Sequence, residues 1–415
     1  MASSISSSEE IVHDTRHPLP SGLRLTAADR PGMAQPVPER DIPHQPWRAM
    51  ALAVTVLVML LTSLWEWKMR TLELVPGDLG ESYDRWAELR RQVDKRNVPV
   101  VILGDSRILF DSDLDRATQL IGVRPLQLAI AGGSGLPILE DIAADPHFKG
   151  LVIVGMAETA YFDLQLTGVR PQKALELSRW ESPSKRGSFL IQRVLSHGLA
   201  MLDDNYQLST LVFRLDHDWR PGVSDPRDAI WKAQETGAGG QTWLWRRLEH
   251  DRRLSEHMRN AWHMFFPSQP LDGQTINAIL VRTKIAVDKI RAHGGDVVFV
   301  RPPSAHDLRV IEDKHVPRAK VWDAILAYTH SNGVHIDDLP AVQNLTLPES
   351  SHLSRACATV FTDAYLRGLA GKTPLLHLQS GTPPALSTRN CVRPSLAGLP
   401  SAFLLRVPQS QRSGP

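Results

Sequence analysis

Residues 98–110 read VPVVILGDSRILF, and this stretch decides the fold. The apolar run over residues 98–103 is typical of a buried parallel strand, and the Gly104-Asp105-Ser106 that follows it is typical of a turn. Open α/β sheets bind their ligands at the carboxyl ends of their strands. A strand that ends in a tight turn there presents the Ser106 hydroxyl as a candidate nucleophile. The alternative is an ordinary strand-to-loop turn.

A second motif lies far downstream of this serine. Residues 347–354 read LPESSHLS and precede an apolar-periodic helix that is predicted over residues 356–369. A serine hydroxyl needs a base within hydrogen-bond reach and a third group that orients the base. His352 and Glu349 supply these two residue types on a loop that enters a helix. Alone, such a pair is also typical of a solvated helix cap, but with Gly-Asp-Ser after the first strand it predicts a catalytic triad with Ser106.

The remaining pattern alternates between strands and helices. Strands are expected near residues 99–103, 126–130, 151–155, 296–301 and 334–337. Helices are expected near residues 82–96, 136–144, 273–293, 317–330 and 356–369. Five strands that alternate with helices predict an α/β fold with a doubly wound, mainly parallel five-stranded sheet that is covered on both faces.

The Gly-Asp-Ser and Glu-x-x-His motifs resemble those of the SGNH/GDSL hydrolase superfamily, over about residues 95–370. The resemblance implies a flavodoxin-like sheet and acyl transfer through Ser106, with His352 as the base and Glu349 as its orienting acid. The family's usual acid is Asp, so Glu349 is one methylene longer. The triad can still form if the loop shifts to accommodate it.

The same resemblance identifies candidate oxyanion donors. In that family, the amide of the nucleophile and a glycine after the second strand bind the oxyanion through backbone N–H groups, which need no reorganisation during the reaction. Residues 129–135 read AIAGGSG at this place. Gly132 matches the glycine by spacing, Gly133 is the alternative, and Ser106 supplies the second amide.

One family feature is missing. The third block of the family is usually Gly-x-Asn-Asp, and its Asn completes the oxyanion hole, whereas residues 155–158 read GMAE here. Losing one such donor lowers the rate by about 100- to 1000-fold. Arg107 and Arg301 are the candidate substitute donors. Each is alternatively an ordinary ion-pairing or phosphate-binding arginine.

An uncharged run over residues 49–65 lies between Trp47 on one side and Trp65 and Trp67 on the other. Its length suits a membrane-spanning helix, and tryptophans at both ends suit the two interfaces. We expect a single anchor over residues 47–67, with a signal-peptide core or a buried helix as the alternatives. Flanking basic residues are balanced and do not orient it. Similarity to SGNH proteins that edit cell-surface polysaccharide implies the inner membrane, with the domain on the periplasmic side.

The other segments follow from composition. The predicted organisation is a disordered tail over residues 1–46, the anchor, a linker with an amphipathic helix over 68–97, an SGNH-like domain over 98–370 and a disordered tail over 371–415. Within the domain, residues 162–266 interrupt the alternation of strands and helices. This insertion is rich in arginine and carries Trp180, Trp219, Trp231, Trp243, Trp245 and Trp262. It is expected to form a lid or substrate platform, or alternatively its own small core or a partner interface.

Charge and cysteine content limit the classes of ligand and cofactor that are expected. The formal net charge is +2, from 47 Lys and Arg against 45 Asp and Glu, so no nucleic-acid partner is expected. Cys357 and Cys391 are the two cysteines in the sequence, which allows one disulfide and offers no metal-ligand cluster. No metal and no cofactor are expected.

Two functions follow as expectations. The resemblance implies a membrane-anchored serine esterase or O-acyltransferase that acts on acyl esters, chiefly acetyl esters, of a cell-surface glycan or on a small ester. The alternative is a catalytically weak SGNH-fold protein that binds a surface polymer or a membrane-bound acyltransferase partner. The missing Asn favours this second function.

Overall fold

The computed structural model describes residues 45–96, 98–216, 232–237, 239–262 and 269–391. The chain forms two compact units, residues 1–63 and residues 64–415. The predicted N-terminal tail lies outside the described residues up to position 44.

Helix α1 (Trp47–Thr71) contains the predicted anchor. It is long and apolar enough to span a membrane, with a mean hydropathy of 1.9 over its most apolar window. Its last turns belong to the second unit, where Met69 is buried in the core. The helix therefore continues beyond the predicted end of the anchor at residue 67.

The second unit is built on a parallel five-stranded sheet in the order β2-β1-β3-β6-β7. Its strands are β1 (Val100–Leu103), β2 (Leu126–Gln127), β3 (Leu151–Gly155), β6 (Asp296–Arg301) and β7 (Gly333–His335). All five predicted strands are present, although β2 is shorter than expected and β7 ends two residues before its predicted end, where the 3-10 turn η4 (Ile336–Asp338) begins. Nearly every strand residue is buried, so each strand reads as an apolar run.

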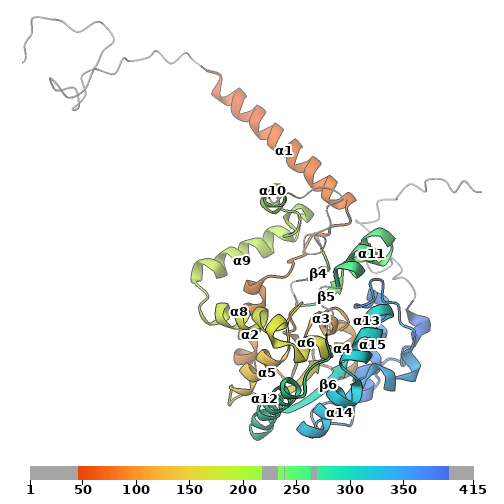
Figure 1. Cartoon of the computed structure of the whole chain (residues 1–415). Helices are drawn as coiled ribbons and strands as arrows, with labels where there is room; N and C mark the ends of the chain where they lie inside the picture. Colours follow the sequence, from red (N-terminus) through yellow and green to blue (C-terminus); the bar gives the residue numbers. More distant parts are fainter. Residues whose placement is uncertain (1–44, 97, 217–231, 238, 263–268, 392–415) are drawn as a thin grey trace, which may run out of the picture. The chain divides into compact units, whose positions relative to one another are not determined.

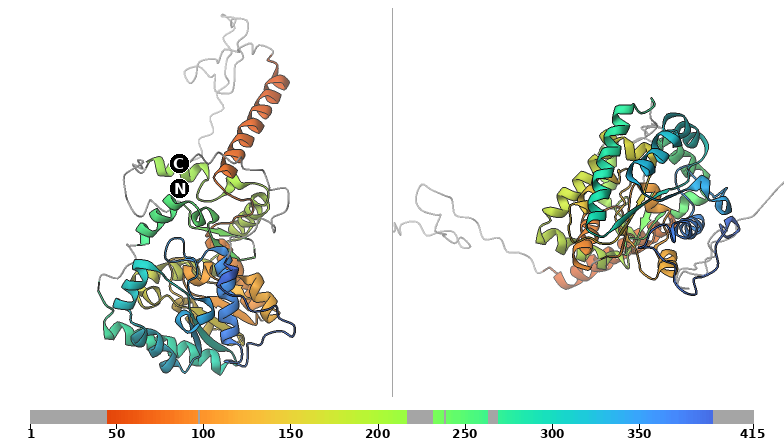
Figure 2. Two further views of the ribbon diagram at one scale, coloured as in Figure 1. Left: turned by 90° about the vertical axis from the view of Figure 1, so that its right-hand side faces the viewer. Right: turned by 90° about the horizontal axis from the view of Figure 1, so that it is seen from below.

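Alternate strand residues enter two separate cores, as the period of two along a strand requires. Ile102 lies in the core on one face and Val101 in the core on the other. The first face carries α3 (Ser106–Phe110), α4 (Leu114–Ile121) and α15 (Arg355–Leu369). The second carries α2 (Tyr83–Arg96), α5 (Leu136–Ala143), α8 (Val169–Arg179), α12 (Gly273–Ala292) and α14 (Arg318–Thr329). Figures 1 and 2 show the helices on both sides of the strands.

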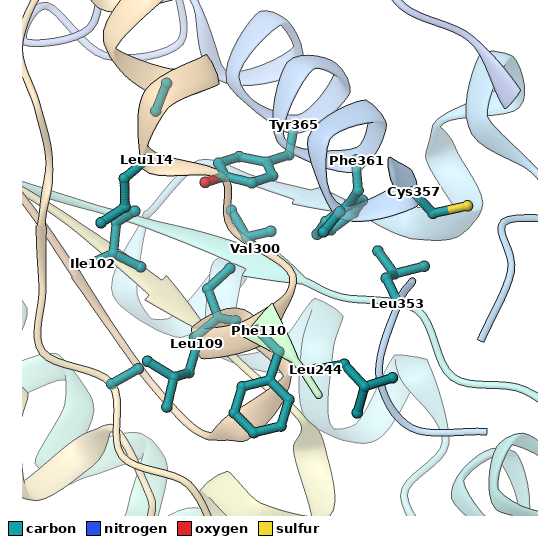
Figure 3. Packing of buried hydrophobic residues seen from close by; sticks show 14 of the residues in the cluster. Ile102, Leu109, Phe110, Leu114, Leu244, Val300, Leu353, Cys357, Phe361 and Tyr365 are labelled. Atoms are coloured by element: carbon teal, nitrogen blue, oxygen red, sulfur yellow. The ribbon is translucent and has the colours of Figure 1, made fainter. Parts of the chain in front are cut away.

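The first core joins segments that are distant in sequence. Figure 3 shows Phe361 and Tyr365 of α15 beside Val300 of β6, with Phe110 of α3 and Leu244 below them. Leu244 belongs to β5 (Thr242–Leu244), which pairs antiparallel with β4 (Gln234–Thr236). The insertion thus shares the core of the sheet.

The other regular elements in the described part of the insertion are helices. The insertion contains the end of α6 (Glu158–Phe162), α7 (Leu164–Thr167), α8, α9 (Pro183–Ser196), α10 (Leu208–Asp216), α11 (Arg252–Ala261) and the short 3-10 turns η1 (Ala200–Leu202) and η2 (Arg246–Glu249). Trp245 is buried in the first core and Trp243 packs against that core, whereas Trp180 is exposed. Trp219 and Trp231 lie outside the described residues. Trp243 and Trp245 therefore extend the main core and do not form a separate one.

Two predicted boundaries are wrong. Residues 68–82 are no linker, because Leu74 and Leu79 are buried in the domain. Residues 371–391 are no disordered tail: Leu376 is buried in the first core, and Cys391 forms a disulfide with Cys357 of α15. Spaced leucines supply apolar anchors within a segment whose Pro and Ser content suggests disorder. Residues 392–415 lie outside the described residues.

The other elements are α13 (His306–His315), η4 (Ile336–Asp338), η5 (Pro340–Val342) and η6 (Thr388–Asn390).

Candidate active site

The turn after β1 needs two glycines. Gly104 has φ +146°, and a Cβ on it would lie 2.3 Å from the carbonyl oxygen of Gly155. A Cβ on Gly155 would lie 2.0 Å from the Cβ of Ile108 in α3. Larger residues at either place would push α3 away from the sheet. The glycines therefore let α3 begin at Ser106, directly at the carboxyl edge.

Asp105 fixes this turn to the neighbouring strand. Its carboxylate accepts the N–H of Arg107 at 2.8 Å and the N–H of Ala157, after β3, at 2.8 Å. The residue is buried, and burial raises its pKa. One side chain thus caps α3 and connects the ends of two adjacent strands beside Ser106.

The structure brings the three predicted triad residues together. Ser106 Oγ lies 2.8 Å from His352 Nε2, and His352 Nδ1 lies 2.7 Å from Glu349 Oε1. Glu349 and His352 are fully buried, whereas Ser106 is partly accessible. With the ring proton on Nδ1 and donated to the carboxylate, Nε2 is free to accept the serine proton. This is the geometry that activates a serine hydroxyl.

The loop that carries the base is held by its own acid. Glu349 accepts the backbone N–H of His352 at 2.7 Å and that of Ser351 at 3.2 Å. Trp262 Nε1 also donates to this carboxylate. The His352 ring packs between Phe110, at 4.5 Å between ring centroids, and Trp262, at 5.4 Å. Packing and hydrogen bonds therefore restrict the imidazole to one orientation.

Asp111, at the end of α3, is a further support that the motifs do not reveal. Its Oδ1 accepts the N–H of Leu353 at 2.9 Å, next to the base. Its Oδ2 has no hydrogen-bond partner in the described part of the chain. The side chain is fully buried, and burial raises its pKa well above the usual range. Asp111 thus positions the loop that carries the base.

The structure distinguishes the two glycine candidates for oxyanion binding. Gly133 donates its N–H to the carbonyl of Ile130 at 3.0 Å and is engaged within its own turn. Gly132 has φ +64° and lines the cavity beside Ser106. Gly132 is therefore the better placed of the two, and the structure does not support Gly133 as a donor.

The two arginine candidates for a substitute oxyanion donor also differ in their position and partners. Arg301 donates to Glu158 at 3.1 Å, to Glu312 at 2.7 Å and to the carbonyl of Pro302 at 2.7 Å, and it is not among the described residues that line the cavity. The proposed role of Arg301 as a substitute oxyanion donor is therefore wrong, because its guanidinium is committed to buried ion pairs.

Arg107 lines the cavity but is also buried in an ion pair. Its Nη2 pairs with Glu312, and its Nε donates to Ser351 Oγ at 3.3 Å. Its Nη1 has no hydrogen-bond partner in the described ranges. Burial would raise the pKa of Glu312, but the Arg107 and Arg301 guanidinium groups outweigh it and hold that pKa well below its usual range. Arg107 therefore combines a structural pairing with a position at the site.

The cavity has a volume of about 530 Å³. Ala157, at the position where the SGNH motif has Asn, lines it, and the N–H of Ala157 is bonded to Asp105. Other side chains on its walls carry hydrogen-bond donors, and most of them come from the insertion: Thr159, Arg170, Asn205, Lys232, Gln234 and Trp262. Of these, the sequence motifs single out only Trp262, and only as a member of the insertion.

A buried charge cluster adjoins the same cavity. Lys232 is paired with both Asp78 and Asp203, and all three are buried. Asp204, which lines the cavity with Lys232, has its pKa raised to about 6 by burial and by the neighbouring carboxylates Asp203 and Asp78. These residues come from three separate segments, so no sequence motif could identify the cluster.

Within the described ranges, no group of three or more His, Cys, Asp or Glu side chains is arranged to hold a metal ion. Comparison of the sequence with protein-family models and with curated proteins finds no match. The geometry of the site therefore carries the functional inference.

Proposed function

We propose that this protein is a membrane-anchored serine esterase or O-acyltransferase of the SGNH type. The observation that carries the proposal is the continuous hydrogen-bonded series Ser106–His352–Glu349 at the carboxyl edge of a parallel sheet. The strand order supports it, since numbering the sheet strands along the chain gives 2-1-3-4-5, the flavodoxin-like order of doubly wound folds.

The residues divide the reaction between them. As Ser106 Oγ bonds to the ester carbonyl carbon, His352 Nε2 takes the hydroxyl proton, and Glu349 stabilises the resulting imidazolium. The N–H groups of Ser106 and Gly132 bind the oxyanion. Collapse breaks the bond to the leaving alcohol, which receives the proton from His352 and leaves an acyl-serine. Water or a sugar hydroxyl then attacks this ester by the reverse steps, giving hydrolysis or transfer.

The proposed substrate is an acyl ester, chiefly acetyl, of a cell-surface glycan or a small ester. Apolar residues such as Phe110, Leu308 and Val316 line the cavity together with the hydrogen-bonding groups from the insertion. Such a mixture suits an acyl group attached to a polar alcohol.

The proposed location is the inner membrane, with the domain on its periplasmic side. Helix α1 supports a single-pass anchor. The Cys357–Cys391 disulfide supports the periplasmic side, because disulfides persist in oxidising compartments and are rare in the cytosol.

The second candidate function is binding without efficient catalysis, to a surface polymer or to a membrane-bound acyltransferase partner. The observation that favours it is Ala157, which lacks a side-chain donor and whose N–H is already bonded to Asp105. On this proposal, the site is intact in geometry but lacks one oxyanion donor.

One experiment separates the two candidates. The detergent-solubilised full chain is treated with a fluorophosphonate probe, which reacts with activated serines. The enzyme proposal predicts labelling that Ser106→Ala abolishes and that Ser184→Ala, at an exposed serine, leaves unchanged. Absence of labelling in the folded wild-type protein would favour the binding function.

A further inference from the structure

Helix α9 exposes a continuous apolar stripe. Leu190, Ile191, Val194 and Leu195 are between 47% and 72% exposed, whereas Phe189, on the opposite side, is buried. These four positions recur with helical spacing, so their side chains share one face. An apolar face of this extent, in a chain whose strands bury almost all of their side chains, needs a partner.

Helix α10 adds a second apolar surface beyond the turn η1, through which it follows α9 in the chain. Leu208 and Val212, one turn apart, are 67% and 47% exposed. Gly198, in the connection from α9, has no side chain, and a Cβ there would meet no described atom within 4 Å. The two stripes together form what we call the α9–α10 surface.

The α9–α10 surface is tied to the end of the anchor. Glu66 accepts the N–H of Ala200 at 3.0 Å and of Met201 at 2.9 Å, and Arg70 donates to the carbonyl of Gly198 at 3.1 Å. Glu66 and Arg70 belong to the same compact unit as α9 and α10. The loop that joins the two exposed helices is therefore fastened to the last turns of α1.

Chain connectivity then sets the depth of this loop. Glu66 directly follows Trp65, the last residue of the uncharged run. Four residues of helix rise by about 6 Å, so Arg70 lies within about 6 Å of the position of Glu66 along the axis. The headgroup layer on each side of a bilayer is about 5–8 Å thick. A loop bonded to both side chains thus lies at headgroup depth if α1 spans the membrane.

We propose that the α9–α10 surface lies on the bilayer, with its apolar stripe at the boundary between headgroups and acyl chains. This inference rests on the proposed anchor. Its occupant is lipid because the loop that joins the two helices is bonded to the end of the anchor helix, and because α9 has no Asp or Glu and carries Lys185, which suits a membrane surface. Its other basic residues, Arg186 and Arg193, are paired with Glu181 and Glu88. Asn205, between η1 and α10, lines the cavity. When the α9–α10 surface lies on the bilayer, the cavity wall that contains Asn205 therefore lies near the membrane.

The test uses nitroxide labels on single cysteines in the full chain, reconstituted in phosphatidylcholine–phosphatidylglycerol vesicles. Both cysteines of the sequence are bonded to each other, so introduced cysteines react selectively. Val194→Cys reports the α9–α10 surface and Leu57→Cys reports the anchor. Val310→Cys, an apolar residue of α13 that is 67% exposed, is the matched control. Collisions with oxygen indicate lipid, and collisions with a water-soluble nickel complex indicate solvent.

We expect oxygen to dominate at positions 57 and 194 and nickel to dominate at 310. If 57 is in lipid but 194 behaves like 310, the surface inference is overturned while the anchor stands. If 194 is shielded from both reagents, protein covers the surface and the inference is again overturned. If the label at position 57 is exposed to water, α1 does not span the membrane, and the inference, which rests on the anchor, is overturned as well. The esterase proposal is judged separately by probe labelling.

Discussion

Two clusters of charged side chains lie at the same cavity. They differ in whether they offer a reactive group to a ligand. The Lys232 cluster is closed on itself, because one ammonium is neutralised by Asp78 and Asp203 in a buried setting. The triad is open, because the last member of its series, Ser106 Oγ, is partly accessible. Removing one member of the closed cluster would leave buried charges without partners and destabilise the fold, whereas the open cluster can act on a ligand.

The largest expected effect tests the open cluster. Ser106→Ala and His352→Ala should each lower kcat for short acetyl esters by at least about 10⁴-fold, because the nucleophile and its base act as one unit. Glu349→Ala should leave more residual activity, since the acid only orients and stabilises the imidazole. His257→Ala, at an exposed histidine, is the control. Turnover in Ser106→Ala equal to wild type would end the mechanism.

The next effect tests the closed cluster. Lys232→Met removes one partner of a buried ion pair and leaves two uncompensated carboxylates, so the free energy of unfolding should fall by about 3–5 kcal/mol. Denaturant unfolding measures it, with Lys284→Met on the surface of α12 as the control, expected to change it by under about 0.5 kcal/mol.

In the fraction of Lys232→Met that remains folded, labelling of Ser106 should persist. A stable Lys232→Met protein without labelling would reverse the distinction between the two clusters, because the lysine would then belong to the site.

A pH experiment sharpens the same comparison at a second closed cluster. Glu235 is bonded to Arg246 at 2.7 Å and to Arg355 at 2.9 Å. Burial raises its pKa, but these two guanidinium groups outweigh burial and lower it from 4.5 to about 2. The stabilisation is therefore complete above pH 4.5 and is lost as the pH falls through about 2.

Glu235→Gln should thus be less stable than wild type at pH 7, by up to about 3 kcal/mol, with the difference shrinking toward pH 2. Thermal unfolding across this range checks it. Glu256→Gln, in an exposed pair with Arg252, should track wild type throughout. A deficit that does not change with pH would show that the ion pair is not its cause.

The smallest effect concerns the support of the triad. Trp262→Phe keeps an aromatic ring beside His352 but removes the N–H that donates to Glu349. We expect about a 10-fold loss of kcat, as for one lost hydrogen bond to a charged group. Trp180→Phe, at an exposed position, should leave kcat unchanged. If the loss of kcat in Trp262→Phe is matched by a loss of folded protein, Trp262 acts through packing alone.

The fold was largely predictable because its strands are buried on both faces and read as apolar runs. Residues 151–155, for example, match β3 from end to end. Helix α2 was predictable from helical spacing, since the apolar residues Trp86, Leu89 and Val93 recur on one face of residues 82–96 and are buried in the structure. Residues 371–391 were missed because scattered leucines reveal burial only once α15 is in place.

The candidate site was predictable as far as its signals are local. Gly-Asp-Ser and Glu-x-x-His each lie within four residues, and the topology of a parallel sheet brings them to one edge. Arg301 was misjudged because its carboxylate partners, Glu158 and Glu312, come from other segments. Asp111 and Lys232 escaped notice for the same reason, since tertiary packing alone gives them their partners.

The disulfide joins two segments that both follow the last strand of the sheet in the chain. Cys357 and Cys391 both follow β7, the last strand of the sheet, so every strand is available to fold before either thiol emerges. With two cysteines in the whole sequence, a single chain has only one way to pair them. Maturation therefore requires an oxidant but no disulfide reshuffling, and a chain shortened before residue 391 would be left with an unpaired thiol on the helix that follows the His352 loop.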